Sequence, residues 1–194
     1  MLFAVIASAV LGSVLGAARD PTKVCLPDKF QALIFAFQND ITGLIAFDFP
    51  NERISVRTTS NGLRIVYNLT DDTALSINET DGKCIQLPKD LKLQTIATRC
   101  LPANAVQLGN VSTYIGVGST QTKFEGWELQ FPGIGTVTAA VTTTTPAIPI
   151  LRQFVSADGK DRESVFFFNV QTTIDDNSIF NVPDVCSPAT VVGK

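Results

Sequence analysis

The side chains that could do acid–base chemistry in this sequence are carboxylates that occur in close pairs. Two carboxyl groups on either side of a glycosidic bond perform the reaction of most glycoside hydrolases, and the acid of the pair needs burial to raise its pKa. Asp71 and Asp72 follow a glycosylation sequon in an expected loop, and Glu125 falls on the polar side of an expected strand. Solvation explains these groups better than catalysis does. The candidate pairs are Asp71-Asp72, Glu125 with Glu128, and Asp175-Asp176.

The sequence contains no histidine. This excludes Ser-His-Asp and Cys-His nucleophilic sites and histidine-bearing zinc sites. The glycines at 116–118 and 133–135 lack the spacing and the strand-to-helix setting of a nucleotide-binding motif. The formal net charge is −3 and there is no basic patch, so nucleic acid is not an expected partner. We expect no enzymatic activity and no required cofactor.

The run IDDNSIFNVPDVC near the carboxyl end offers hard oxygen ligands at Asp175, Asp176, Asn177 and Asp184. Such ligands suit extracellular Ca²⁺. The run lacks the central glycine and the terminal glutamate of an EF-hand loop, so an Asx-type turn after the preceding strand is the favoured explanation. A calcium site at Asp175 and Asp176 is the alternative prediction.

The four cysteines point to an oxidising compartment. They are even in number, and their spacings of 59, 16 and 86 residues fit no CxxC metal site. Two disulfides are therefore expected, and the residues alone leave three connectivities open. The cysteines are Cys25, Cys84, Cys100 and Cys186.

Residues 1–18 read as a secretory signal peptide that is cut after Ala18. An apolar run at 2–15 gives way to small residues and then to polar Arg19 and Asp20. The alternative is a membrane anchor, but the run is shorter than the ~20 residues that span a bilayer, and no second run follows. The expected mature protein is secreted and has no integral membrane segment. Three sequons for N-glycosylation agree with this route: Asn68, Asn78 and Asn110.

Residues 19–194 have the periodicity of β-strands and are expected to form a single domain. In LRIVYNL, Leu63, Ile65 and Tyr67 alternate with polar positions that include Asn68. No sustained helical stripe occurs, and Pro, Gly, Asn and Asp pairs separate the runs. Short strands at this spacing predict an all-β sandwich or barrel. The expected strands are 31–37, 43–49, 53–57, 63–69, 73–80, 92–96, 113–118, 123–131, 136–145, 149–155 and 163–170.

The charged stretch at 41–57 reads as a hairpin rather than an active site. Pro50 and Asn51 supply turn geometry between two apolar strands. Asp48 or Glu52 is expected to pair with Arg53 or Arg57 across the turn, and an exposed pair of this kind contributes about 0–1 kcal/mol.

An ordered set of segments resembles the ependymin-related family of secreted glycoproteins. The resemblance covers about residues 25 to 186. The family implies a curved antiparallel β-sandwich, or half-barrel, similar to bacterial lipoprotein carriers, with an apolar pocket, homodimers and calcium association. The segments are KVCLP, GLIAFDFPNERISVR, INETDGKCIQL, FEGWELQF and FFFNVQTTIDDNSIFNVPDVC.

The resemblance also implies a disulfide pairing, Cys84 with Cys186. The family's usual partner of the first cysteine falls in a segment that reads TTTTPAIPILRQF here and has no cysteine. This is a departure from the family, and it leaves Cys25 to pair with Cys100.

An apolar pocket is thus implied by the family and not by periodicity. The alternative is that the same residues form a filled core. The expected function is non-enzymatic binding of a lipid, a fatty acid or another hydrophobic small molecule. The alternative is a calcium-associated adhesion, matrix or signalling protein without a lipid, whose partner is the extracellular matrix or a receptor. The expected pocket residues are Phe47, Ile65, Tyr67, Leu75, Trp127 and Phe131.

Overall fold

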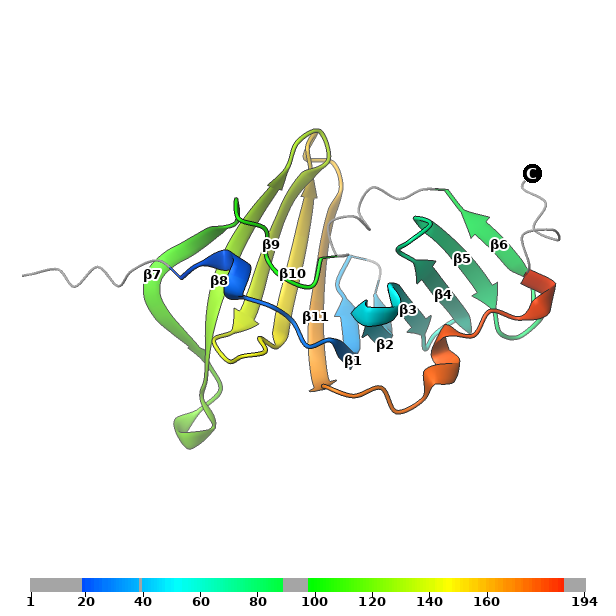
Figure 1. The fold of residues 1–194 in the computed structure, drawn as a ribbon, viewed down its shortest axis with the longest axis horizontal. Coiled ribbons are helices and arrows are strands. Elements are labelled where there is room, and N and C mark those ends of the chain that lie inside the picture. Colours follow the sequence, from blue (N-terminus) through cyan, green and yellow to red (C-terminus); the bar gives the residue numbers. More distant parts are fainter. Residues whose placement is uncertain (1–18, 39, 89–97, 187–194) are drawn as a thin grey trace, which may run out of the picture.

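The computed structural model describes residues 19–38, 40–88 and 98–186. Within these residues, eleven strands form one antiparallel sheet in the order β6-β5-β4-β3-β2-β1-β11-β10-β9-β8-β7 (Figure 1). The predicted all-β, curved antiparallel fold is confirmed, but the described strands form one open sheet and not the two stacked sheets of a sandwich. The strands are β1 Lys29–Ala36, β2 Ile41–Asp48, β3 Arg53–Thr58, β4 Leu63–Asn68, β5 Thr73–Asn78, β6 Cys84–Leu87, β7 Val106–Ile115, β8 Thr122–Phe131, β9 Gly135–Thr142, β10 Pro149–Ser156 and β11 Arg162–Gln171.

Two meanders make up this sheet, because neighbours in sequence are neighbours in space within β1–β6 and within β7–β11. The first and last strands, β1 and β11, join them side by side at the centre. Short 3-10 helices lie in the connections: η1 Pro21–Lys23, η2 Phe49–Asn51, η3 Gly118–Thr120, η4 Asn177–Phe180 and η5 Asp184–Cys186. The strand expected at 92–96 lies outside the described residues.

The β8–β9 hairpin shows how local sequence fixes the sheet. Gly135, the first residue of β9, has a φ of +154°, and a Cβ built there would lie 2.2 Å from the carbonyl oxygen of Val155 and 2.9 Å from the Phe154 ring. Phe154 is 1% exposed. Only glycine lets the turn close this tightly over a buried aromatic ring.

Residues that face each other across antiparallel strands share one face of the sheet. Phe30 on β1 lies opposite Phe47 on β2, which lies opposite Ile54 on β3. All three are buried, and the rings of Phe30 and Phe47 stack with centroids 4.6 Å apart. We call the face that carries them the inner face and the opposite one the outer face.

Two irregular segments cover the sheet, each on a different face by the register of the strands they contact. Residues 24–26 and 98–101, which we call the strap, lie against the inner face of β8–β10, where Val24 packs with Trp127 and Leu129. The carboxyl-terminal segment 172–186 lies against the outer face of β2–β5. There Ile179 and Phe180 pack on Ala46, and Cys186 packs on Val66 and Ile77.

The covering of the outer face changes how β4 is buried. The alternation predicts Arg64 and Val66 on a polar face, but both are buried. Arg64 Nη1 donates to the carbonyl oxygens of Ile179 at 2.9 Å and Asn181 at 2.6 Å, so the hydrogen bonds that hold the carboxyl-terminal segment also offset the cost of burying the arginine. Asn68, at the end of the strand, is exposed as expected.

The predicted hairpin and the pairing of Asp48 with Arg53 are confirmed, but the pair is not exposed as expected. Asp48 is 0% exposed, and its Oδ2 accepts hydrogen bonds from Asn51 at 2.8 Å and from Arg53 at 2.8 Å. Lys29 lies 3.4 Å from the other oxygen. Burial by itself raises the pKa of Asp48, but the hydrogen bonds from Asn51 and Arg53 and the nearby ammonium group of Lys29 outweigh it and lower the pKa. The guanidinium of Arg53 also lies 4.2 Å from the centroid of the Phe180 ring, so this ion pair is part of the packing of the carboxyl-terminal segment.

No helix among the described residues is long and apolar enough to cross a membrane.

Candidate functional site

An apolar cavity of about 90 Å³ lies between the inner face of the sheet and the strap, and it is partly open to solvent. Natural cores have few voids larger than a water molecule, and a cavity of this size has room for more than one. The space is therefore larger than a packing defect. Its lining residues are Val24, Leu26, Phe30, Phe47, Thr98, Arg99, Leu101, Leu129, Val137, Ala139, Val141, Pro149, Leu151, Arg152 and Phe167.

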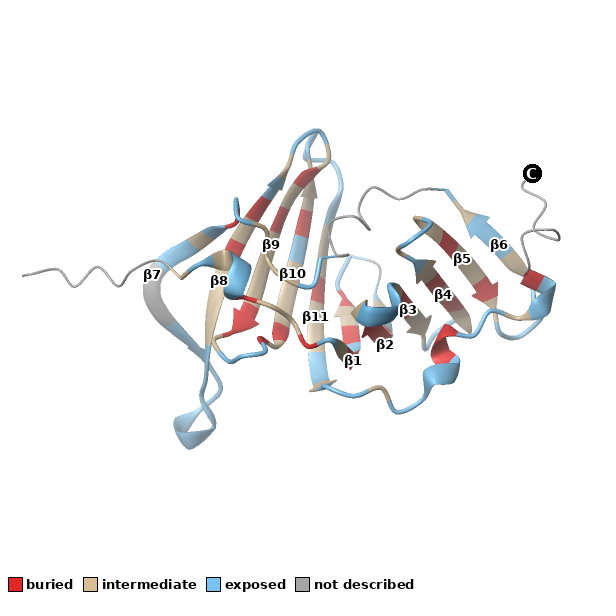
Figure 2. Cartoon of the chain, in the orientation of Figure 1, coloured by how far each residue is buried: buried red, intermediate tan, exposed pale blue. Residues whose placement is uncertain are grey.

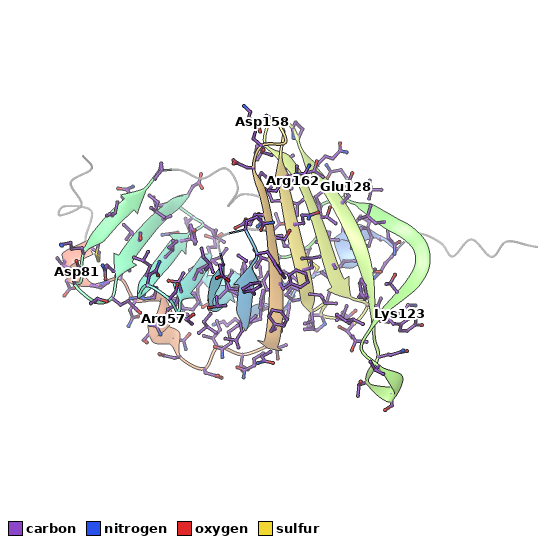
Figure 3. All side chains as sticks on the ribbon, turned by 180° about the vertical axis from the view of Figure 1, so that it is seen from behind. Arg57, Asp81, Lys123, Glu128, Asp158 and Arg162 are labelled. Atoms are coloured by element: carbon purple, nitrogen blue, oxygen red, sulfur yellow. A yellow bond between two sulfur atoms is a disulfide. The ribbon has the colours of Figure 1, made fainter. Side chains whose placement is uncertain are left out.

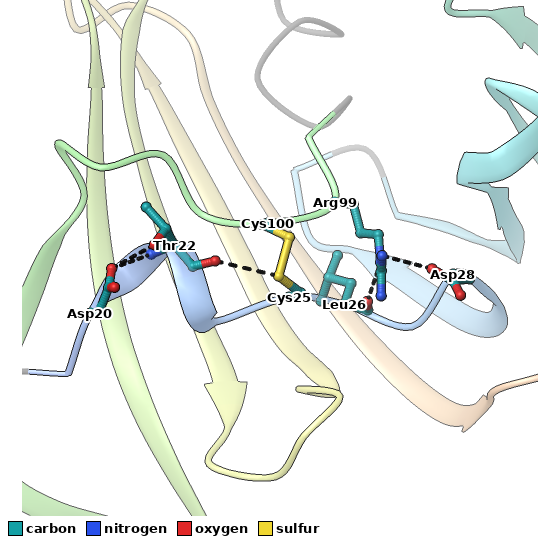
Figure 4. The surroundings of a disulfide bond; sticks show 7 residues. All are labelled: Asp20, Thr22, Cys25, Leu26, Asp28, Arg99 and Cys100. Carbon is teal, nitrogen blue, oxygen red and sulfur yellow. Dashed lines mark hydrogen bonds and ion pairs between the residues drawn. A yellow bond between two sulfur atoms is a disulfide. The ribbon is translucent and has the colours of Figure 1, made fainter.

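The two segments of the strap are joined by one disulfide (Figure 4) and by a short β-bridge. Cys25 and Cys100 are bonded, although they are 75 residues apart in the chain. The backbone nitrogen of Leu26 donates to the oxygen of Arg99 at 2.9 Å, and that of Leu101 donates to the oxygen of Val24 at 3.0 Å. A third bond, from the nitrogen of Ala147 to the oxygen of Cys25 at 2.8 Å, fixes the strap to the loop between β9 and β10.

Two arginines are the charged residues in the lining of this apolar site. Arg99 pairs with Asp28 at 2.8 Å, and its Nε donates to the oxygen of Leu26 at 3.0 Å. The side chain of Arg99 is 43% exposed and borders both the cavity and two wider surface grooves. Arg152 is more deeply placed, at 14% side-chain exposure, and pairs with Glu163 at 3.0 Å.

The chemistry of the lining favours binding over reaction. Its side chains are aliphatic or aromatic except for Thr98 and the two arginines, and no described lining residue is a carboxylate or a thiol. Apolar walls with one or two placed polar groups are typical of sites for hydrophobic small molecules. Guanidinium groups beside such walls add the means to pair with an anionic or polar end.

Of the residues predicted for the pocket, Phe47 lines the cavity. Trp127 is 1% exposed and belongs to the apolar cluster that adjoins it, and Phe131 packs against that cluster. Ile65 and Tyr67 lie on β4, and Leu75 lies on β5 beside Cys186; none of these three lines the cavity.

The strap is the part of the site that sequence reasoning missed. Its five lining residues come from two segments that the strand pattern leaves unassigned. The signal that could have found it is the apolar flanks of the two cysteines, in VCL at 24–26 and CL at 100–101. Two short apolar segments joined by a disulfide must pack on something, and the inner face is the apolar surface within reach.

The two disulfides implied by the family resemblance and its departure, Cys84 with Cys186 and Cys25 with Cys100, are the ones in the structure. The sequons fall at strand ends or on an edge strand. Asn68 is exposed, Asn78 is half-buried, and Asn110 lies on β7, with its side chain outside what the structure describes.

The predicted calcium ligands make hydrogen bonds within the protein. Asp175 Oδ2 accepts from Gln31 Nε2 at 2.7 Å. Asp176 caps η4, since it accepts from both the hydroxyl and the backbone nitrogen of Ser178, and these two bonds lower its pKa. Asp176 thus forms the Asx-type turn that the sequence favours. Among the described residues, no group of three or more metal-ligating side chains comes together.

The fold separates one of the candidate carboxylate pairs. Glu125 and Glu128 are three positions apart on β8, so they lie on opposite faces. The prediction that Glu125 lies on a polar face is wrong: it lies on the inner face with Trp127, its side chain is 9% exposed, and it pairs with Arg19 at 2.7 Å. Asp71 accepts a hydrogen bond from Asn68 at 2.9 Å.

Comparison with known proteins gives a likeness of fold. No family model matches the chain, and no curated protein matches it in sequence. The crystal structure of an uncharacterized conserved protein from Thermus thermophilus is similar, with a TM-score of 0.51 and 9% identity, over 80% of this chain and 86% of that one. This likeness supports the curved β-fold and carries no statement about function. The resemblance to the ependymin-related family stays a prediction.

Proposed function

We propose that this protein is a secreted, non-enzymatic glycoprotein that binds a hydrophobic small molecule in the cavity under the strap. The observation that carries the proposal is the cavity itself, with apolar walls and a disulfide-bonded cover. A filled core would have closed a void of this size.

The size of the cavity bounds the ligand. A volume of about 90 Å³ takes a small apolar group or one end of a larger ligand. A longer acyl chain fits if its remainder leaves past Arg99 into the adjoining grooves. Burial of the ligand's apolar surface favours binding by roughly 25 cal/mol per Å².

The first test fills the cavity from its floor. Ala139 on β9 lines the cavity, while Ala140, the next residue, points to the opposite face and does not line it. Both are half-buried, so they form a matched pair. We expect Ala139→Leu to weaken binding of a fluorescent medium-chain fatty acid at least tenfold and Ala140→Leu to leave it unchanged. Equal affinities for the two variants would contradict the proposed site.

The second test asks what the protein carries. Native mass spectrometry of the secreted protein, followed by organic extraction, is expected to find a stoichiometric apolar compound in the wild type and less of it in Ala139→Leu. A protein that comes out empty and ignores added fatty acids would overturn the carrier function. The same spectra report cleavage after residue 18 and glycans at the three sequons.

A calcium site is the less direct part of the proposal. The carboxylates of Asp175 and Asp176 lie at the start of the carboxyl-terminal segment, where each already accepts hydrogen bonds. Calorimetric titration with Ca²⁺ tests it: heat that disappears in Asp176→Asn supports the site, and its absence in the wild type refutes it.

A second candidate function is interaction between proteins, and one surface favours it. Leu33 on β1, Phe37 just after β1 and Phe168 on β11 are 44%, 60% and 49% exposed on the outer face. With half-buried Phe35 and Phe166 they form a continuous apolar patch, in which Phe37 packs edge-on against both of these rings. The patch is uncharged, so two copies of the chain can stack their sheets there without repulsion. A dimer in light scattering that Phe37→Ser converts to monomer would support this; a monomeric wild type would exclude it.

A further inference from the structure

The β7–β8 hairpin projects beyond the rest of the sheet (Figure 1). Every residue from 113 to 123 is exposed, and the projection is the longest continuous exposed part of the two strands (Figure 2). We call residues 113–123 the tip. Its sequence, TYIGVGSTQTK, needs an explanation because apolar side chains stand at its far end.

Three large apolar side chains of the tip are open to solvent. Val117 is 83% exposed, Tyr114 is 54% and Ile115 is 50%. Isolated exposed apolar residues are common, but three within four positions on a projection form an exposed apolar patch.

The turn holds Val117 outward in a defined conformation. Gly116 has a φ of +107°, and a Cβ there would lie 2.5 Å from the oxygen of Thr120. Thr120 donates two hydrogen bonds to the oxygen of Val117, from its nitrogen at 3.1 Å and its hydroxyl at 2.7 Å. Hydrogen bonds between its own residues thus close the turn. The turn conformation is what leaves Val117 exposed.

The apolar side chains surround the tip rather than lining one side of it. Ile115 is paired with Thr122 and Tyr114 with Lys123, so the two apolar residues point to opposite faces of the ribbon. Val117 stands between them in the turn. A flat protein surface would contact one face and leave the other in water. A medium that encloses the whole end of the hairpin contacts all three.

The charge of the tip points to the same medium. Lys123 is its only charged residue, and it has no carboxylate, although the whole chain has a net charge of −3. Lys123 lies where the hairpin leaves the sheet (Figure 3). A lysine and a tyrosine behind an apolar end match the headgroup level of a bilayer, where the amphipathic ring and the ammonium group meet water and phosphate.

We infer that the tip binds a lipid surface by inserting Val117, Ile115 and Tyr114 at the boundary between headgroups and acyl chains, with Lys123 beside the phosphates. This site is separate from the cavity, since none of these residues lines it. It therefore goes beyond the proposed function and can fail or hold independently of it.

The test is flotation of the full secreted protein with phosphatidylcholine vesicles, with and without phosphatidylserine. We expect the wild type to bind both, and Val117→Asp and Ile115→Asp to bind at least tenfold less. The matched control is Ile85→Asp, because Ile85 is 65% exposed on β6 at the other end of the sheet, and the same change there should leave binding intact. Binding of the fluorescent fatty acid in the cavity should be the same in all four proteins.

A second readout locates the inserted residue. The described cysteines are all in disulfides, so Val117→Cys supplies a single thiol for an environment-sensitive dye. A blue shift of its emission on adding vesicles, absent when the dye is at Ile85→Cys, is expected. A wild type that does not float, tip variants that float like the wild type, or a dye at position 117 that stays in water would each overturn the inference.

Discussion

The disulfide that ties the strap is the feature whose removal should separate stability from binding. The change is Cys25→Ser with Cys100→Ser, and its matched control is Cys84→Ser with Cys186→Ser. The two bonds close loops of similar length, with sequence separations of 75 and 102. In the chain-entropy model, their removal costs about 4.5 and about 4.7 kcal/mol of unfolding free energy. The two variants should therefore be destabilised nearly equally.

Ligand binding should distinguish them. The strap supplies five of the fifteen residues that line the cavity, whereas Cys186 packs on the outer face with Val66 and Ile77. Loss of the strap bond leaves apolar residues such as Leu101 without a fixed position over the ligand. A loss of about 1.4 kcal/mol is tenfold in affinity, and loosening several partly buried apolar side chains exceeds it. We expect the strap variant to bind at least tenfold more weakly and the control variant to bind normally.

The unfolding free energy and the ligand affinity can be measured on the same samples. Trp127 is the single tryptophan and is buried, so its fluorescence follows unfolding in urea. A fluorescent fatty acid reports binding at urea concentrations below the transition. If either double variant does not fold, Leu101→Ala replaces it as a milder change to the strap. Equal loss of affinity in both variants, or none in the strap variant, would refute the assignment of the strap to the site.

Two other predictions concern stability. Because the pKa of Asp48 is lowered in the folded protein, its contribution is complete above the ordinary value near 3.8 and is lost as the pH falls through the lowered value. Asp48→Asn should thus lower the free energy of unfolding by about 2–3 kcal/mol at pH 7, because charge-assisted hydrogen bonds are lost. In acid unfolding, the stability difference from the wild type should shrink below about pH 4. A difference that stays constant with pH would refute this. Gly135→Ala should lower the free energy of unfolding in urea by about 2–4 kcal/mol, because its Cβ would meet the oxygen of Val155. Its control is Gly133→Ala, where φ is +75° and no atom lies within 4 Å of the new Cβ; this change should lower it by about 1 kcal/mol. Similar costs for the two glycines would show that the contact with Val155 is unimportant.

The class of fold was open to prediction because alternation of apolar and polar residues is a local property. Strand periodicity and turn residues place ten of the eleven expected strands on or beside strands of the structure, and the eleventh lies outside the described residues. The hairpin at 41–57 followed from Pro50 and Asn51 in the same way. The burial of Asp48 could not be predicted in this way. It depends on Phe180 and the carboxyl-terminal segment, which are more than 120 residues away.

The candidate site was open to prediction only in part. Phe47 was found because it is a large apolar residue on a strand, but Ile65 and Leu75 have the same pattern and lie elsewhere. Periodicity indicates which side chains are buried, but it does not indicate which buried side chains contact one another. A cavity depends on where packing stops, and no local pattern reports that.

The sequence by itself determined the β-structure, the number of disulfides and the absence of histidine chemistry, since each is fixed by residue type and near neighbours. The tertiary structure decided what covers each face of the sheet. The strap and the carboxyl-terminal segment lie on opposite faces, each tied by one disulfide, and they turn polar positions such as Arg64 into buried ones and an apolar face into a lined cavity. The reason is that burial is a relation between segments distant in the chain, and only their packing in space establishes it.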